Sequence, residues 1–319
     1  MALSYSQLDS ITEKKFIKKL VDNVYDTNAL LARLTRPEKI MLKDGGTKII
    51  APIIKSKPGV GGYYSDLEEL DISHTDDITA AEFEWKQIYE PIRISRADIL
   101  KNSGDAAKLN LIASKVKIAE KNIKENLGIG LFSDGTASTG ALTTKQITGL
   151  QATIDTSSTY GGIAVADLAE WVAVSKNNSG TDRALSMPLM QQAFGAVTYD
   201  DDKPTVMVCR QNVYDQLWSL YQPHQRLMSK EMAQLGFEDV LVFNGKPVIV
   251  DSHCEAQKIL FLNEEYLGLA VHKDENMRVD KKESLETSNS MLHKIFWMGN
   301  LVCNGRRYQA ELSDIEVAS

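Results

Sequence analysis

The stretch DAAKLNLIASKVKIAEKNIKENLGIGLF, residues 105–132, predicts one long amphipathic helix. Its apolar residues follow one another in steps of three and four, which places one side chain per turn on a single face. At ~1.5 Å per residue the helix would be roughly 39 Å long, enough to span a whole domain. The apolar face consists of Leu109, Ile112, Val116, Ala119, Ile123 and Leu127.

Length and charge limit the class of protein. A chain of 319 residues has room for two domains, or for one domain split by an insertion. Its composition, 43% hydrophobic and 25% charged, is typical of a globular protein with a sizeable core. The formal net charge of −7 argues against a protein that grips nucleic acid over its whole surface, because phosphate binding depends on Lys and Arg. A protein that only encloses nucleic acid is compatible with this charge.

The cysteines and the N-terminal sequence indicate the compartment. Cys209, Cys254 and Cys303 are odd in number and far apart, which favours reduced, buried thiols in a cytosolic protein. The first residues lack the apolar run of a signal peptide, and no stretch approaches the ~18 apolar residues of a membrane span. We therefore expect a cytoplasmic protein that does not enter a membrane.

Residues 10–34 predict a second amphipathic helix, with Phe16, Leu20 and Val24 on one face. Two interpretations remain open for this segment. It is either a packed helix with a solvated basic face, or an N-terminal arm that docks on a neighbouring subunit or an acidic partner. The basic face carries Lys14, Lys15, Lys18 and Lys19.

Residues 47–55 and 78–95 predict two long strands, joined by a loop rich in glycine and acidic residues. In the second strand, Phe83 and Trp85 alternate with charged side chains, as expected for a strand with two different faces. A two-stranded ribbon is marginally stable by itself in water. We therefore expect the ribbon to lie on another surface, and a neighbouring subunit could supply it.

The loop between these strands contains six acidic residues and no Lys or Arg from position 66 to position 77. The order of the acids differs from that of a calcium-binding loop, so no metal site is predicted. A solvated loop and an acidic patch that meets a basic patch on a partner both remain open. The acids are Asp66, Glu68, Glu69, Asp71, Asp76 and Asp77.

Shorter elements alternate from residue 153 to residue 270 and predict an α+β unit. Asn244-Gly245 is a strong hairpin signal between two of its strands. We expect helices over 165–175, 188–199 and 211–221, and strands over 204–209, 239–243, 247–251, 258–262 and 266–271. The chain then ends in longer strands, over 277–283, 291–302 and 306–312, with Asn304-Gly305 as a second hairpin turn. If these last strands pack on the helix 105–132, the α+β unit is an insertion into a split domain.

Two enzyme-like motifs do not support an enzyme. Gly128-Ile129-Gly130 ends a helix, whereas a dinucleotide loop follows a strand and opens a helix. Asp134-Gly135-Thr136 matches part of a phosphotransferase motif, but Phe132 stands where the nucleophilic Asp would be. The five histidines are scattered, so we expect no enzyme and no cofactor.

One further cluster contains residue types that bind metals, at positions 251–255. Four ligands within five residues cannot readily close a tetrahedral site, so we assign this segment to a surface turn and predict no metal. The residues concerned are Asp251, His253, Cys254 and Glu255.

The order of these parts resembles that of the major capsid proteins of tailed bacteriophages, whose fold is shared with encapsulin shells and the herpesvirus capsid floor. In that family an N-terminal arm, a long two-stranded loop and a spine helix precede an inserted α+β domain and long C-terminal strands. Residues 236–251, GFEDVLVFNGKPVIVD, and 299–312, GNLVCNGRRYQAEL, are similar to later stretches of phage capsid chains. The resemblance covers essentially the whole chain and depends on the order and length of its parts.

The resemblance implies an α+β phage-capsid fold in five parts. They are an N-terminal arm (1–45), an extended β-loop (46–96), a peripheral domain with the spine helix (97–149), an inserted axial domain (150–275) and the C-terminal strands of the peripheral domain (276–319).

The implied function is structural. The chain would self-assemble through hexamers and pentamers into an icosahedral head that encloses double-stranded DNA without sequence-specific binding. The alternative is an encapsulin-type shell around a cargo enzyme. The implied partners are further copies of the chain, a separate scaffolding protein, a portal and decoration proteins, in a virion that is assembled in the host cytoplasm. We match no residues to the Lys–Asn cross-link of some family members, so none is predicted.

The candidate inter-subunit contacts follow from the need for heterologous interfaces, in which one patch meets a different patch and the subunits close into rings. The acidic ribbon and the basic segments elsewhere in the chain would supply two such patches. The candidate residues are Lys57, Tyr63, Tyr64, Asp66, Glu68, Glu69, Lys14, Lys18, Arg306 and Arg307.

Overall fold

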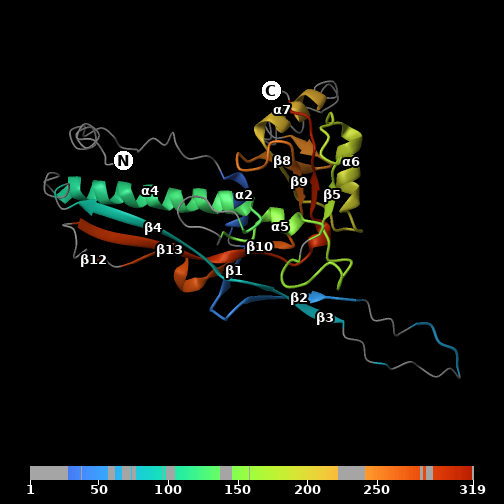
Figure 1. Ribbon diagram of the computed structural model, residues 1–319, viewed down its shortest axis with the longest axis horizontal. Helices are drawn as coiled ribbons and strands as arrows, with labels where there is room; N and C mark the ends of the chain where they lie inside the picture. The colour runs from blue at the N-terminus through green and yellow to red at the C-terminus, as the bar shows by residue number, and fades with distance from the viewer. Residues whose placement is uncertain are drawn as a thin grey trace.

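Two six-stranded sheets, a two-stranded ribbon and one long helix make up the fold in the part of the chain that the structure describes (Figure 1). The computed structural model describes residues 28–36, 38–56, 62–66, 73, 77–95, 97, 105–136, 146–157, 159–221, 241–280, 283–284 and 290–317. Most of the predicted arm helix and most of the acidic loop lie outside these residues. No helix in the part of the chain that is described is long and apolar enough to cross a membrane.

The predicted long helix is confirmed as α4 (Asp105–Leu131). Ala119, Ile123 and Leu127 are buried at the expected spacing, and Val116 is partly buried against the same core. The side chains of Leu109 and Ile112 lie outside the described part. α4 runs along two strands of the first sheet, and the Asn122 side chain donates a hydrogen bond of 2.8 Å to Glu90 in one of them (Figure 1).

The first sheet is built around the long strand β13 (Ser290–Cys303). β13 pairs antiparallel with β4 (Lys86–Ser95) over the whole length of β4. The apolar residues Ile92, Ile94 and Ile295 of this pair are buried in the core that also holds α4. The remaining strands of the sheet are β1 (Ile40–Lys43), β10 (Leu267–His272), β11 (Arg278–Val279) and β12 (Glu283–Ser284).

The second sheet has a buried core on each of its faces. In β6 (Val206–Cys209), Val206 and Val208 join the core that contains α4, whereas Met207 and Cys209 join a separate core. The separate core is closed by α6 (Met187–Ala196) and α7 (Gln211–Tyr221). The strand order is β5 (Val174–Lys176), β14 (Ala310–Leu312), β9 (Ile259–Leu262), β6, β8 (Lys246–Val250) and β7 (Val242–Phe243).

Short elements connect these layers. α2 (Ala29–Leu34) packs beside α4, and α5 (Leu150–Ile154) follows the end of α4. Two single-turn 3₁₀ helices, η2 (Lys273–Glu275) and η3 (Arg306–Tyr308), lie near the ends of β10 and β13. The ribbon consists of β2 (Ile49–Ile54) and β3 (Ile78–Phe83).

Several local predictions are confirmed. The helices predicted over 188–199 and 211–221 are α6 and α7. The Asn244-Gly245 hairpin joins β7 to β8, and both residues have positive φ angles, 48° and 76°, as a two-residue hairpin turn requires. The three cysteines of the chain are buried and free, and burial raises the pKa of the Cys209 thiol to about 12.

Three local predictions are wrong, because tertiary pairing overrides the local pattern. Residues 165–175 are turns and the start of β5 instead of a helix, since Val174 N–H bonds to Gln309 O beside β14. The run 78–95 divides after Phe83, because β3 pairs with β2 and β4 pairs with β13. Asn304-Gly305 forms no hairpin turn, because β14 pairs with β9 and β5 instead of β13.

Candidate assembly surfaces

The ribbon has two apolar faces. β2 and β3 pair antiparallel from Ile49 opposite Phe83 to Ile54 opposite Ile78, so residues that face each other share a side of the ribbon. The inner side is buried against the body and contains Ile49, Ala51, Ala81 and Phe83. The outer side is exposed in a single subunit and contains Ile50, Pro52, Ile54, Ile78 and Ala80.

The inner side holds the ribbon to the body. Glu82 N–H donates a hydrogen bond of 2.8 Å to Gly161 O, and the Phe83 ring meets Tyr160 edge to face at 5.1 Å. Gly161 has a φ of +59°, and a Cβ atom there would lie 2.7 Å from the Cβ atom of Ala81. A glycine is therefore required where the ribbon crosses this loop.

The apolar side chains on the outer side are not buried within one subunit. Ile54 is 77% exposed and Ile78, directly opposite, is 70% exposed. Single exposed apolar residues are common, but a continuous apolar face is typical of an interaction site. The only charged residue on this side in the described part of the ribbon is Glu82, which pairs with Lys48 at 2.5 Å.

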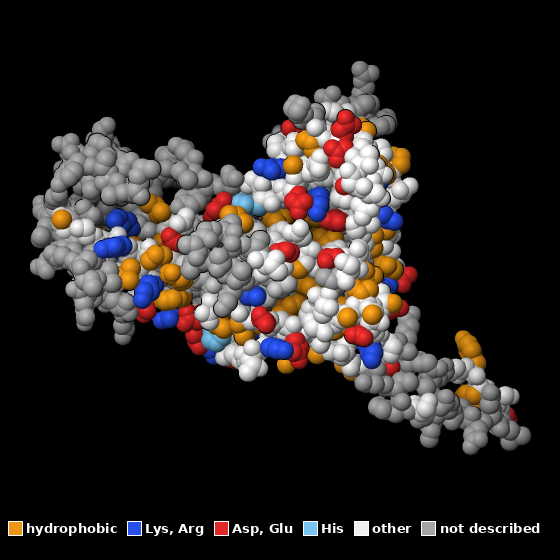
Figure 2. Space-filling model, viewed as in Figure 1, with side chains coloured by type: hydrophobic (Ala, Val, Ile, Leu, Met, Phe, Trp, Pro, Cys, Tyr) orange, Lys and Arg blue, Asp and Glu red, His pale blue; other side chains and the backbone are white. Residues whose placement is uncertain are grey.

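Beyond the ribbon strands, residues 62–66 lie far from both six-stranded sheets (Figure 1). Tyr63 is fully exposed and Tyr64 is 70% exposed, and hydrophobic side chains are visible at this end of the molecule (Figure 2). Asp66 is exposed beside them. The other predicted contacts of the ribbon and arm, Lys57, Glu68, Glu69, Lys14 and Lys18, lie outside the described residues.

The structure corrects the prediction for Arg306. Its side chain is completely buried, so it is not available to a neighbouring subunit in this fold. The guanidinium donates to the backbone carbonyl oxygens of Thr153 at 2.8 Å and Trp171 at 3.3 Å, and also to that of Asp155. Burial lowers the pKa of Arg306 from its ordinary value.

Arg307 remains a surface residue, with a side chain that is 34% exposed. Its guanidinium carbon lies 3.9 Å from the centroid of the Tyr199 ring and 5.3 Å from that of Tyr308. Glu170 lies 4.0 Å from its Nη1 atom. Arg307 therefore presents a positive charge on an aromatic platform.

An anchor for the N-terminal part of the chain has no sequence signal. Arg33 in α2 donates two hydrogen bonds of 2.7 Å to the carboxylate of Glu264, and Lys39 bonds to the Glu264 carbonyl oxygen. Burial alone would raise the pKa of Glu264, but hydrogen bonds from Arg33 and Thr205 outweigh it and lower the pKa. Such a bidentate pair is stronger than an ordinary surface ion pair, so it fixes α2 on the body.

The segment 251–255 contains a turn, as the sequence predicts, but only Glu255 is exposed, so the segment does not lie on the surface as a whole. Asp251 and Cys254 are buried, because this segment lies under α2 and against α4. The described residues contain no group of three or more His, Cys, Asp or Glu side chains that could hold a metal ion.

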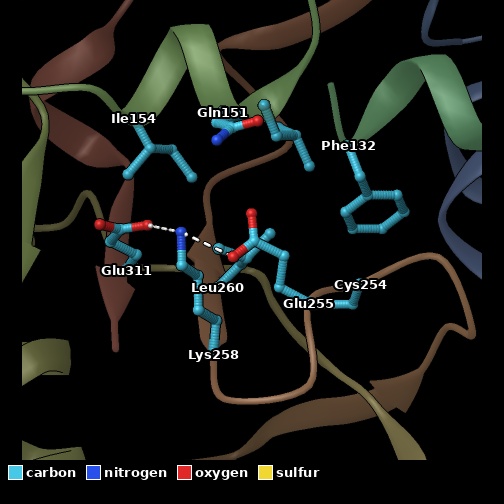
Figure 3. A pocket seen from close by; sticks show the side chains of 9 residues that line it. Phe132, Gln151, Ile154, Cys254, Glu255, Lys258, Leu260 and Glu311 are labelled. Carbon is cyan, nitrogen blue, oxygen red and sulfur yellow. Dashed lines mark ion pairs between the residues drawn. The ribbon is translucent and has the colours of Figure 1, made fainter. Parts of the chain in front are cut away.

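A small cavity beside this segment has a volume of about 20 Å³ (Figure 3). Lys258 points into it between two carboxylates, with its Nζ atom 3.0 Å from Glu255 and 3.4 Å from Glu311. A volume of this size holds a water molecule, whereas ligand sites are about 300 Å³ or more. The cavity therefore belongs to the packing between α5 and the second sheet.

The sequence matches the family model described as SU10 major capsid protein over residues 88–289, more than half of the chain. No curated protein matches the sequence significantly.

Solved structures with a similar fold cover nearly the whole chain. The capsid asymmetric unit of cyanophage A-1(L) is 16% identical with a TM-score of 0.73, over 95% of this chain and 96% of that one. Gordonia phage Cozz gives 12% identity and a TM-score of 0.62, over 96% and 91%. The encapsulin of the holo-SrpI complex from Synechococcus elongatus PCC 7942 gives 11% identity and a TM-score of 0.62, over 100% and 98%. At these identities the likeness shows a common fold, that of phage capsid and encapsulin shells.

Proposed function

Because this chain belongs to the SU10 major capsid protein family, we propose that it self-assembles through hexamers and pentamers into an icosahedral head around double-stranded DNA. It is a structural component of a phage capsid and not an enzyme, and its place is the shell of the virion. The association through hexamers and pentamers and the enclosed double-stranded DNA are what we propose beyond this.

The observation that carries the proposal is the outer apolar side of the ribbon. A two-stranded sheet that is apolar on both sides needs two surfaces to bury them, and one subunit supplies only the inner one. A second copy of the chain is the partner that a shell makes available at every position. A contact between this ribbon and a different patch on the neighbour is heterologous, and such contacts form rings when the rotation between subunits closes.

The same proposal assigns roles to the other surface residues. Tyr63, Tyr64 and Asp66 at the end of the ribbon would contact the neighbour, together with Lys57, Glu68 and Glu69. Lys14 and Lys18 would act from the arm, and Arg307 from the body. Arg306 is excluded by its burial.

We also propose a domain assignment. The first sheet with α4 corresponds to the peripheral domain, and the second sheet with α6 and α7 corresponds to the axial domain. β10 and β14 pair outside the parts to which the residue bounds assigned them, so the two domains would exchange strands.

The proposed partners are a separate scaffolding protein, a portal and decoration proteins, with assembly in the host cytoplasm. The DNA would be enclosed without sequence-specific contacts. The net charge of −7 supports a wall that holds DNA without gripping it.

The test is electron microscopy of the purified protein after co-expression with its scaffolding protein. We expect closed shells with fivefold and sixfold capsomers. A protein that sediments only as a stable monomer under these conditions would contradict the proposal.

A second candidate is an encapsulin-type compartment, because the encapsulin match covers the whole chain. The same micrographs separate the two. Shells that fill with DNA in infected cells indicate a phage head, whereas small shells with dense protein inside indicate a compartment.

A further inference from the structure

A buried charged cluster connects α4 to the segment between β8 and β9. The His253 ring lies between two carboxylates, with Nε2 at 2.9 Å from Glu125 Oε1 in α4 and Nδ1 at 3.2 Å from Asp251 Oδ1. The side chain of His253 is 9% exposed and that of Asp251 is 1% exposed. Ion pairs of this kind depend on each other, because removing one partner leaves a buried charge uncompensated.

Asp251 extends the cluster to α2. Its Oδ2 atom accepts a hydrogen bond of 3.0 Å from the backbone N–H of Leu30 in the first turn of α2. The N–H groups of a first turn have no partner within their own helix. Asn28, the residue before α2, makes no side-chain cap and instead donates 2.7 Å to the Lys124 carbonyl oxygen of α4. Asp251 therefore takes the place of a local cap.

The charges around His253 favour its protonated ring. A hydrogen bond to Asp251 and then one to Glu125 raise the pKa of His253 to about 9, against the effect of burial. The other carboxylate oxygen of Glu125 is buried without a partner in the described part of the chain, so His253 is its compensation.

The other titratable groups on the neighbouring elements do not pair with the His253 ring. On its own segment, Cys254 is a buried thiol and Glu255 pairs with Lys258. In α2, Arg33 is bound to Glu264, and on α4 the side chain of Lys124 is exposed. The two carboxylates are therefore the groups that decide the charge of the ring.

We propose that His253 is a positioning residue for α2. The protonated ring orients Asp251 toward the Leu30 amide, and this contact fixes α2. A neutral ring can donate only one hydrogen bond. Either Glu125 would then lose its partner, or Asp251 Oδ1 would keep only the hydrogen bond of 3.1 Å from the backbone N–H of His253. The proposal concerns the folded subunit and does not depend on how subunits assemble.

The sign of the pH effect follows from the direction of the shift. The pKa of His253 is raised on folding, so its contribution is fully present below about 6.5, the ordinary value. It is lost as the pH rises through about 9. We therefore expect α2 to become less stable in alkaline solution, while the second sheet keeps its packing.

The experiment is hydrogen–deuterium exchange of the purified protein, followed in a peptide that spans α2 and in one that spans β9. Protection is corrected for the intrinsic effect of pH. The variants are His253→Gln, which removes the charge, and Glu125→Gln, which removes one acidic partner. His293→Gln in β13 is the matched control, because that histidine lies outside the cluster.

At neutral pH we expect His253→Gln to reduce protection of α2 about tenfold, the size expected for one lost hydrogen bond to a charged group. Protection of β9 should not change. In the wild type, protection of α2 should fall as the pH rises through about 9. This fall should be absent in His253→Gln and should begin at lower pH in Glu125→Gln.

Unchanged protection of α2 in His253→Gln would overturn the proposal. If that variant does not fold, the wild-type profile decides: protection of α2 that stays level from neutral pH to pH 10 would also overturn it. A parallel loss of protection in α2 and β9 would show a general structural role instead of positioning, and would equally count against it.

Discussion

At the scale of single residues, Arg306 in η3 links the segment that follows β13 to α5, which is about 150 residues earlier in the chain. Its guanidinium donates to the carbonyl oxygens of Thr153 and Asp155 at the C-terminal end of α5. Those carbonyl groups have no partner within their own helix. The positive charge of this side chain also interacts favourably with the negative, C-terminal end of the helix dipole. One buried cation therefore satisfies several backbone groups that would otherwise be unpaired.

We predict that Arg306→Ala destabilises the subunit by about 3 kcal/mol or more, because several buried carbonyl groups lose their donor. Arg307→Ala is the matched control next to it. That residue is partly exposed, so its loss should cost less than about 1 kcal/mol. The measurement is urea unfolding of the unassembled subunit, followed by circular dichroism.

Equal effects of the two substitutions would show that the different burial of these neighbours has no energetic consequence. A neutral Arg306→Ala would mean that water replaces the guanidinium at the end of α5.

The two arginines also show what sequence can reveal at this scale. Arg306 and Arg307 are identical and adjacent, and nothing local distinguishes the buried one from the exposed one. The difference arises from the carbonyl groups of residues 152, 153, 155 and 171, which folding brings to the guanidinium of Arg306. His253 is similar, since its partner Glu125 is 128 positions away.

At the scale of elements, the ribbon carries the proposed assembly contact. Ile54 and Ile78 face each other on its outer side and are 77% and 70% exposed. Ile53 is on the inner side and packs against the core. Neighbouring positions in one strand should therefore have different roles.

We predict that Ile54→Ser combined with Ile78→Ser lowers the yield of shells at least about tenfold, because burying two such side chains contributes about 3 kcal/mol or more per contact. The midpoint of thermal unfolding of the free subunit should not change. Ile53→Ser is the control in the same strand, and it should lower that midpoint. Particle yield is measured by light scattering and unfolding by calorimetry.

Normal shell formation by the double variant would exclude the outer side of the ribbon as an assembly contact. An equal loss of subunit stability in both variants would show that the two sides are not distinct.

Elements with a strong local signal were predictable, including the strands β6, β9, β10 and β13. A segment whose local pattern disagrees with its distant partner was not. α4 follows from its apolar period, and the β7–β8 turn follows from the positive φ angles that Asn244 and Gly245 tolerate. Residues 165–175 carry an equally apolar pattern. However, β5 is held by pairing with β14, more than a hundred residues later, so the local pattern misled the prediction.

At the scale of the whole molecule, the chain crosses between its two main sheets more than once. β9 lies in the second sheet and the next strand, β10, in the first. β13 then returns through the first sheet, and β14 completes the second. One hydrophobic core also extends from α4 to a face of the second sheet. The inner side of the ribbon belongs to the same core. Relative movement of these parts would break the shared core, so a subunit should enter a shell with its two sheets fixed and the outer side of its ribbon exposed to a partner.

The order and length of the parts therefore indicated the family, but the assembly surfaces required the structure. The sequence shows that successive side chains of the ribbon strands lie on opposite sides of the ribbon. It does not show which of the two sides is buried against the body. That depends on Gly161 and Tyr160, which lie about eighty residues further along the chain. For the acidic loop, the sequence shows the negative charge but does not show which residues it contacts.

The charge of that loop leads to the last prediction. Six acids without an intervening base repel one another unless a partner supplies positive charge. Within a single subunit they would be solvated, and neutralising them would change little. In a shell they would meet basic residues of the next subunit, and Arg307 remains a candidate whereas Arg306 does not.

We predict that Asp66→Asn, Glu68→Gln and Glu69→Gln together reduce particle yield while the free subunit keeps its unfolding temperature. Assembly of the wild type should also weaken as salt is added, because ion pairs at a partly exposed interface are screened over roughly 8–10 Å at ordinary ionic strength. The triple variant should respond less to salt, since it has fewer charges to screen. Neutralising three exposed acids elsewhere, Glu38, Asp200 and Asp201, matches the change in net charge and should leave the yield unaltered. If both triple variants assemble like the wild type at low and at high salt, the acids of the loop make no assembly contact. If both lose yield equally, overall charge governs assembly and the position of the acids does not.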